Sequence, residues 1–301
     1  NNLASCLAFI DAQEYEQAIC CLKKIVETAH SLGATRQLAH GCSYLGIVLQ
    51  RMKGHQDQCV EWHQRHSQLA EGLGDIEERC RALSNLSSSY ILTNQARKAV
   101  EAQEEQLELI KETRTQKDLC RFYGNMSISY RSVQNFERAV ECHQRSLQIA
   151  MDEQDAYLQC MSYHQLGKTY RAMEKLEYAA NCHREGVKCA KKTKLDAEVC
   201  RELHELGCLQ LMLGQDKEAL RVFQEELAIL DKFPDMKLEA ANVRANIGLC
   251  HASTGEWEEA VECFDAHLQV ATEQEDGEGQ RQTNTNLEEA YRSMGEQDKA
   301  L

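Results

Sequence analysis

Cysteines and histidines are the residues of this sequence whose chemistry is most reactive, and both recur at a fixed spacing. The chain has 15 cysteines, an odd number, with no CxxC pair and no signal segment. This usage predicts reduced thiols in a cytoplasmic protein rather than a disulfide framework. One cysteine position also accepts Trp62, Ala102 and Val222, which is typical of a packing position where cysteine acts as a small hydrophobe. The two recurring sets are Cys80, Cys120, Cys160, Cys200 and Cys21, Cys142, Cys182, Cys263.

The histidines follow the same rule. His63, His143 and His183 share one position with Leu22, Phe223 and Phe264, so we expect them to pack between helices with one hydrogen-bonded nitrogen each. His63 and His66 are three residues apart and could form half of a metal site, but the sequence places no third ligand nearby. We therefore expect no metal and no cofactor.

Catalytic motifs are missing from the sequence. It contains no GxGxxG, GxxxxGK[ST], HExxH or GxSxG pattern. Its acidic residues lie in connectors and at helix positions that face solvent. We therefore predict a protein that is not an enzyme.

The net charge is strongly negative. Asp and Glu number 48 against 34 Lys and Arg, which gives −14 at pH 7. Such a chain is a poor general ligand for nucleic acid, because neutralising phosphates supplies most of that affinity. No apolar run approaches the length of a membrane-spanning helix, so we expect no membrane insertion.

These residues are positioned by an internal repeat. A small residue recurs at intervals of 40 or 41 residues, and in five of the seven copies His or an aromatic residue follows it four places later. An incomplete eighth copy begins at Ala300. So regular a period indicates stacked supersecondary units. The copies begin at Ala18, Cys59, Ala99, Ala139, Ala179, Ala219 and Ala260.

Each unit contains two amphipathic stretches with helical spacing, separated by short polar turns. One holds an Asn-Leu-Gly…Tyr landmark, and the other starts near the recurring alanine. The only proline, Pro234, falls in a connector, where it is tolerated. We predict a single array over residues 1–301 with about seven 40-residue repeats, truncated within a repeat at both ends.

The pattern LG-x-x-Y, then Gly, then A-x-x-x-F/H resembles the tetratricopeptide repeat (TPR) family along the whole chain. Segments such as AVECHQRSLQIA, AANCHREGVKCA and LGIVLQRMKGH look like the long repeats of the Pins/LGN-type adaptors. HEAT and armadillo repeats have a similar length but lack this signature. The resemblance implies an all-α fold, a right-handed α-solenoid of antiparallel helix pairs, whose first helices line a concave groove.

The implied groove positions carry basic side chains and no acid. Guanidinium groups match carboxylates, and Asn amides suit an extended peptide backbone. Through equivalent positions in the aligned repeats, the resemblance implies a peptide-binding role for Arg121, Asn125, Arg131, Arg171 and Arg201. The full set of expected groove residues is Arg81, Asn85, Arg121, Asn125, Arg131, His164, Lys168, Arg171, Arg201, His204 and Asn246.

We therefore expect a scaffold or adaptor that binds an extended, acidic segment of a protein partner in its groove. Two alternatives stay open. Some arginines could instead pair with acids on a neighbouring helix, as is common in solenoids. The chain could also be a structural module that assembles, or self-associates, through its convex face or array ends.

Overall fold

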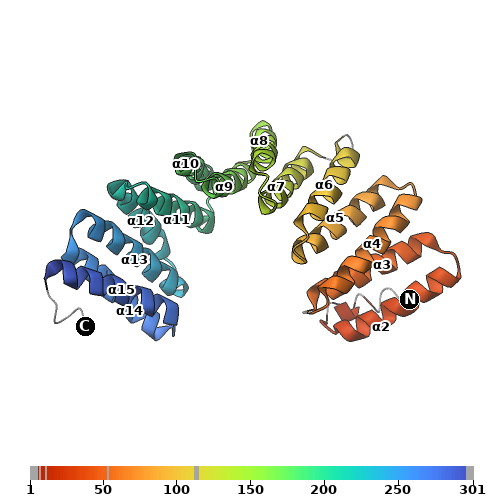
Figure 1. Ribbon diagram of the computed structural model, residues 1–301, viewed down its shortest axis with the longest axis horizontal. Coiled ribbons are helices and arrows are strands. Elements are labelled where there is room, and N and C mark those ends of the chain that lie inside the picture. Colours follow the sequence, from red (N-terminus) through yellow and green to blue (C-terminus); the bar gives the residue numbers. More distant parts are fainter. Residues whose placement is uncertain (1–5, 7, 11, 53, 112–114, 296–301) are drawn as a thin grey trace. The chain divides into compact units, whose positions relative to one another are not determined.

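The computed structural model describes residues 6, 8–10, 12–52, 54–111 and 115–295, and in these residues it contains helices and no strands (Figure 1). This confirms the all-α prediction. The helices are α2 (Tyr15–Ser31), α3 (Thr35–Arg51), α4 (Gln56–Gly72), α5 (Ile76–Leu92), α6 (Ala96–Ile110), α7 (Gln116–Ser132), α8 (Phe136–Asp152), α9 (Ala156–Ala172), α10 (Leu176–Thr193), α11 (Asp196–Met212), α12 (Asp216–Leu230), η1 (Pro234–Met236), α13 (Lys237–Thr254), α14 (Trp257–Glu273) and α15 (Gly277–Met294).

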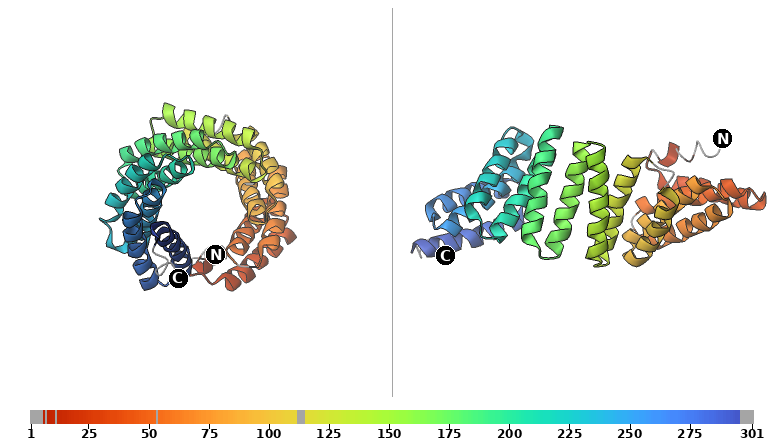
Figure 2. Two further views of the ribbon diagram at one scale, coloured as in Figure 1. Left: turned by 60° about the vertical axis from the view of Figure 1, so that its left-hand side comes forward. Right: turned by 90° about the horizontal axis from the view of Figure 1, so that it is seen from above.

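The chain divides into two compact units, Asn1–Cys142 and His143–Leu301, with the boundary inside α8. Within the first unit successive helices from α2 to α7 pack on one another, and within the second unit successive helices from α9 to α15 do the same (Figure 2). First helices of successive pairs also touch: α3 contacts α5, α11 contacts α13, and α13 contacts α15. Contacts limited to neighbouring pairs define an α-solenoid. The prediction of one array over residues 1–301 stays a prediction.

Close packing inside four of the helix pairs depends on glycines of the first helix. A Cβ on Gly207 would lie 2.6 Å from Cε1 of Phe223, and one on Gly167 would lie 2.5 Å from Nε2 of His183. Neither distance is compatible with a real side chain. The ring from the second helix therefore lies directly on the backbone of the first, and the same holds for Gly46 with His63 and Gly248 with Phe264.

The recurring small residue of the second helix is buried in every described repeat. Exposure is at most 1% from Ala18 to Ala260, while Ala300 lies outside the described residues. The cysteines behave as the repeat predicts: all 15 are free thiols, most are buried, and burial raises the pKa of Cys160 and Cys182 to about 12. The buried cysteines are packing residues.

The histidine position matches the prediction only in part. His183 has one hydrogen-bonded nitrogen, because its Nδ1 lies 2.8 Å from Oε2 of Glu202. In His63, by contrast, neither ring nitrogen has a hydrogen-bond partner. Burial, with the nearby His66, lowers the pKa of His63 to about 4, so its ring is neutral at physiological pH. Here packing on Gly46 replaces hydrogen bonding.

The turns repeat as regularly as the helices. A residue with left-handed backbone follows the first helix of successive pairs, with φ of 57° at Asn94, 61° at Gln134 and 68° at Gly214. Acidic connectors cap the next helix: the Asp75 carboxylate accepts hydrogen bonds from the backbone N–H groups of Glu77 and Glu78. Pro234 begins the 3₁₀ turn before α13, as its connector position predicts.

The glycine contact yields a first prediction. Gly207→Ala should lower the free energy of unfolding by about 1–3 kcal/mol, because the new Cβ overlaps the Phe223 ring. Urea unfolding followed by circular dichroism measures it. Gly277→Ala is the matched control, since a Cβ there meets no atom within 4 Å. Equal midpoints for the two variants would show that the ring contact does not limit packing.

Candidate functional site

The eleven expected groove residues fall into both units. Five lie in the first unit, on α5 and α7, and six lie in the second, on α9, α11 and α13. All eleven are on first helices, as the repeat register requires. Each unit therefore presents its own set of these residues.

Helix α7 presents the least neutralised cations of the expected set. Arg121 and Asn125 are exposed, and no ion pair involves Arg121 within the described part of the first unit. Arg131 is half-buried, and its Nη1 is buried without a hydrogen-bond partner among the described residues. Burial lowers the pKa of Arg131, which indicates an incompletely compensated guanidinium. These three side chains share one helix and lack a partner within it.

Other expected arginines are paired with acids of the same unit. Arg81 Nη1 lies 2.6 Å from Oε2 of Glu78, a carboxylate that also contacts His66. Arg171 of α9 lies 3.0 Å from Oε2 of Glu205 on α11. The structure thus contains the pairing between neighbouring helices that was the alternative to peptide recognition.

Arg201 is also paired with acids of its own unit. Its Nε lies 3.6 Å from Oε1 of Glu202, and its Nη1 lies 3.8 Å from Oε1 of Glu198. Its Nη2 also lies 3.5 Å from Sδ of Met161. The guanidinium therefore covers the buried Glu202 carboxylate instead of standing free.

The remaining expected residues differ in availability. Lys168 is exposed, and Asn246 is half-buried. Asn85 donates a hydrogen bond to Oγ of Ser43 at 3.2 Å, so its amide links two first helices. His164 is buried at 6% exposure, which corrects its assignment to an open groove surface.

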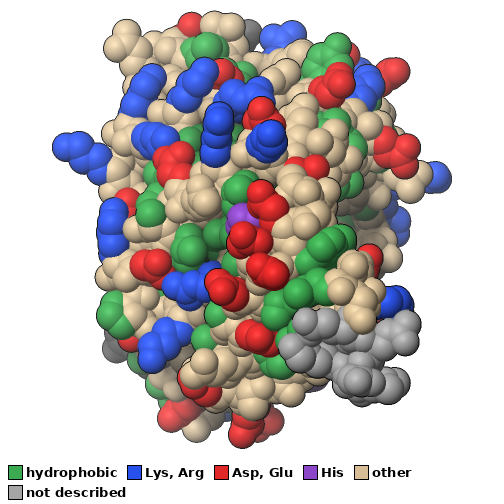
Figure 3. All heavy atoms as spheres, turned by 90° about the vertical axis from the view of Figure 1, so that its left-hand side faces the viewer, with side chains coloured by type: hydrophobic (Ala, Val, Ile, Leu, Met, Phe, Trp, Pro, Cys, Tyr) green, Lys and Arg blue, Asp and Glu red, His purple; other side chains and the backbone are tan. Residues whose placement is uncertain are grey.

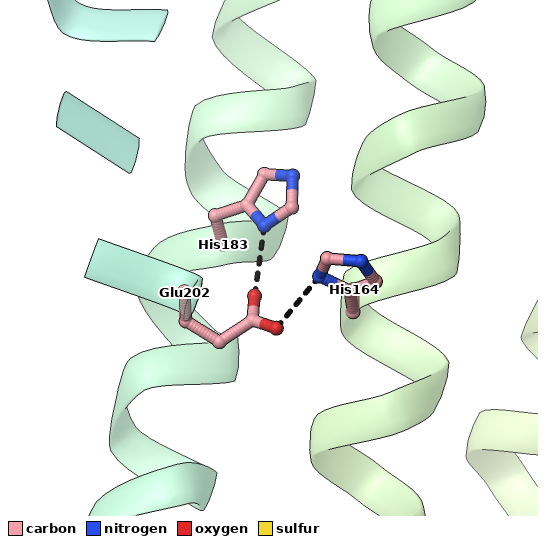
Figure 4. A group of neighbouring side chains, drawn as sticks. All are labelled: His164, His183 and Glu202. Atoms are coloured by element: carbon pink, nitrogen blue, oxygen red, sulfur yellow. Dashed lines mark hydrogen bonds and ion pairs between the residues drawn. The ribbon is translucent and has the colours of Figure 1, made fainter. Parts of the chain in front are cut away.

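His164 belongs to a buried polar cluster with His183 and Glu202 (Figure 4). The Glu202 carboxylate lies between the two rings, with 2.8 Å from Oε1 to His164 Nδ1 and 2.8 Å from Oε2 to His183 Nδ1. Gly186 makes room for it, since a Cβ there would lie 2.7 Å from Oε2. Burial alone would raise the pKa of Glu202, but hydrogen bonds from His164 and His183 outweigh it and lower the pKa.

This cluster has the donor set of a zinc site, two imidazoles and a carboxylate within 4.8 Å of one another. The distances between these atoms, however, indicate that the imidazoles contact the carboxylate directly rather than share a metal ion. Zinc holds ligands at about 2.0 Å, which sets tetrahedral ligand atoms about 3.3 Å apart. The 2.8 Å separations in the cluster are hydrogen-bond distances. We interpret the three residues as an ion-pair network that joins α9, α10 and α11.

The second unit also contains a cavity of about 620 Å³ between α11, α12 and α13. Its apolar wall includes Leu230, Phe233 and Met236, and its charged wall includes Arg201, His204 and Glu226. Asp196, Glu198, Glu205 and Glu239 also line it, so acids outnumber bases there. Acidic and hydrophobic side chains likewise gather near the middle of the face in Figure 3.

Sequence reasoning missed the acids that organise this surface. Glu202 and Glu226 are each at most 4% exposed, and both lie on helix faces otherwise occupied by apolar residues. A signal existed: the position three residues after the packed His or aromatic residue is polar in several repeats. At this position Ser146 forms a 3.0 Å hydrogen bond with Ser162, and His267 forms a hydrogen bond with Thr283. In both cases the partner lies on the next helix.

The fold defines the class of protein, and comparison with known proteins shows which family its repeats match. The class is an α-solenoid of repeated helix pairs. A tetratricopeptide repeat model matches residues 118–192 and 239–301. These two segments are tetratricopeptide repeats. Its resemblance to the Pins/LGN-type adaptors stays a prediction.

Solved structures support the fold. A STAND ATPase with a tetratricopeptide repeat sensor from Pyrococcus horikoshii is 15% identical with a TM-score of 0.73, covering 94% of this chain and 44% of that one. BtubC from P. vanneervenii is 17% identical with a TM-score of 0.61, covering 75% and 92%. A putative kinesin light chain repeat protein from Podosopora anserina is 19% identical with a TM-score of 0.57, covering 65% and 96%.

Comparison with curated protein sequences gave no match. Among the described helices, none combines the length and apolar character needed to cross a bilayer.

The buried cluster yields a second prediction. Glu202→Gln should lower the free energy of unfolding at pH 7 by about 3 kcal/mol, because it leaves the cluster without its anion. The folded-state pKa of Glu202 lies below its ordinary value of 4.5, so its contribution is complete above that pH. The contribution is lost as the pH falls through the folded-state pKa, and the difference from wild type should shrink in acid.

Urea unfolding at pH 7 and at a pH well below 4.5 measures this difference. Glu225→Gln is the control, since its pair with Lys191 is solvent-exposed and should contribute less than about 1 kcal/mol. A Glu202→Gln penalty that is no larger than the control, or that does not change with pH, would contradict the network.

Proposed function

We propose that this chain is a non-enzymatic interaction scaffold that binds an extended, acidic segment of a partner protein, with α7 as its main anchor. The observation that carries this proposal is the state of Arg131, a half-buried arginine whose Nη1 has no hydrogen-bond partner in the described structure. Interaction through protein partners is what the TPR fold is generally used for. The charge of the partner and the anchoring residues are the parts that need testing.

An incoming carboxylate would interact differently with Arg131 than with the paired arginines. A buried donor without an acceptor is costly, and a charge-assisted hydrogen bond removes that cost. At Arg81 or Arg171 an incoming acid would first have to displace Glu78 or Glu205. Most of the gain in binding should therefore come from α7.

The spacing along α7 suits an extended peptide. Arg121 and Arg131 are ten residues apart, about 15 Å along a helix. An extended chain spans that length with about five residues. Asn125 lies between the two arginines and offers both a donor and an acceptor to a peptide backbone. We propose a recognition segment with an acidic residue near each end.

We place this scaffold in the cytoplasm. Support comes from the 15 free thiols, most of which are buried in packing positions that a reducing compartment preserves. Lys168 on α9 is exposed and could add a further contact in the second unit.

A third prediction tests the anchor. The probe is a fluorescein-labelled peptide of Glu, Gly and Ser residues with a Glu near each end, and it should bind the native chain. The same peptide with Gln in place of each Glu should bind at least about tenfold more weakly. Arg131→Gln should cost the acidic peptide about tenfold in affinity, and Arg121→Gln somewhat less, because Arg121 is already solvated. Fluorescence anisotropy at low and high salt measures both.

Arg97→Gln, an exposed arginine on the second helix α6, is the matched control. Circular dichroism verifies folding of each variant. Equal affinity for the acidic and neutral peptides, or equal losses in Arg97→Gln and Arg131→Gln, would refute the proposal. Sedimentation of the free chain separates it from the alternative of assembly through the convex face or ends.

A further inference from the structure

Three side chains of the second unit form a line at the cavity between α11, α12 and α13. Cys208 Sγ lies 3.7 Å from Nε2 of His204, and Nδ1 of the same ring lies 3.3 Å from Oε1 of Glu226. From this arrangement we infer that Cys208 is a nucleophilic thiol, activated by His204 and Glu226, and that hydrogen peroxide oxidises it to a sulfenic acid. This site is independent of the α7 surface.

The helices set this geometry. Cys208 and His204 are four residues apart on α11, so their side chains lie on one face. Glu226 reaches the opposite side of the ring from α12. A thiol, an imidazole and a carboxylate in this order form the arrangement in which a base activates a nucleophile and a third group orients the base.

The buried Glu226 carboxylate is placed to orient the His204 ring and to favour its charged form. Glu226 is 4% exposed, and its Oε2 is buried without a hydrogen-bond partner in the described structure. A buried anion of this kind favours a cation beside it. The hydrogen bond with Cys208, and next the one with Glu226, raise the pKa of His204 to about 10. The ring is therefore an imidazolium at neutral pH, which is the setting that stabilises a thiolate.

A small oxidant can reach the group. His204 lines the cavity with 42% of its side chain exposed, and Cys208 is half-buried. The other charged groups that line the cavity are Lys194, Asp196, Glu198, Arg201, Glu205 and Glu239. Cys250 on α13 adds no charge, because burial raises its pKa to about 12.

The chain supplies its own comparison thiols. Cys200 lines the same cavity and is also half-buried, but no imidazole bonds its sulfur, and burial raises its pKa to about 11. Cys20 is exposed on the surface of α2. Reactivity that followed accessibility alone would favour Cys20, whereas reactivity that followed the imidazole favours Cys208.

The oxidation balances with the groups present. The thiolate sulfur attacks one peroxide oxygen, which forms the S–O bond and breaks the O–O bond. The departing hydroxide takes the proton of the His204 imidazolium and leaves as water. Cysteine loses two electrons, peroxide gains them, and the ring becomes neutral until solvent returns a proton.

The experiment compares all cysteines in the intact native chain. Protein is treated with hydrogen peroxide and dimedone, and in parallel with iodoacetamide from pH 6 to pH 8, with each site quantified by mass spectrometry. Cys208 should react about tenfold faster than Cys200 or Cys20 at the lower pH, because among the described residues it is the one of the three whose sulfur contacts an imidazole. His204→Gln should remove most of this advantage, and Glu226→Gln part of it.

The wild-type comparison is decisive even if a variant fails to fold. Labelling of Cys208 at or below the rate of Cys20 at pH 6 would overturn the inference. So would an unchanged Cys208 rate in folded His204→Gln, normalised to Cys20 in the same sample. Equal labelling of all sites in urea verifies that the native difference comes from the fold.

Discussion

The structure depends on one contact that recurs in four of its helix pairs, the packing of a ring from the second helix onto a glycine of the first helix. At Gly167 and Gly207, for example, the ring lies on bare backbone. The two helices can then approach closely enough to bury the small residue one turn earlier in the second helix. Each pair still exposes an apolar face, so the next pair must cover it.

The identity of the ring decides what else enters the core. Phe223 needs no hydrogen bond, and its partner His204 stays at the cavity, with ring centroids 6.2 Å apart. His183 brings a donor into the interior, and the next helix supplies Glu202 to accept it. Glu202 in turn contacts His164 and is covered by Arg201. At His183, histidine in place of an aromatic residue is thus accompanied by polar groups from three further positions, whereas the ring nitrogens of His63 have no hydrogen-bond partner among the described residues.

The sequence was sufficient to predict the helices, the turns and the packing role of the cysteines, because a repeated period reports which positions tolerate only small or apolar residues. It was not sufficient to predict the charge of the surface. Arg171 meets Glu205 from the adjacent pair, 34 residues further along the chain. Such pairs depend on which side chains face each other across two helices, and a column of basic residues does not reveal its acidic neighbours. Glu202 and Glu226 were missed for the same reason.

These pairings change what a column of arginines means for recognition. An arginine already held by a carboxylate offers an incoming acid only an exchange of partners, with little net gain. A half-buried guanidinium with an unused donor, as at Arg131, gains a full charge-assisted bond. In this chain of net charge −14, several cations, among them Arg81, Arg171 and Arg201, are paired with the protein's own acids. Specificity for an acidic ligand then depends less on how many arginines line the first helices than on which of them the fold leaves without an acid.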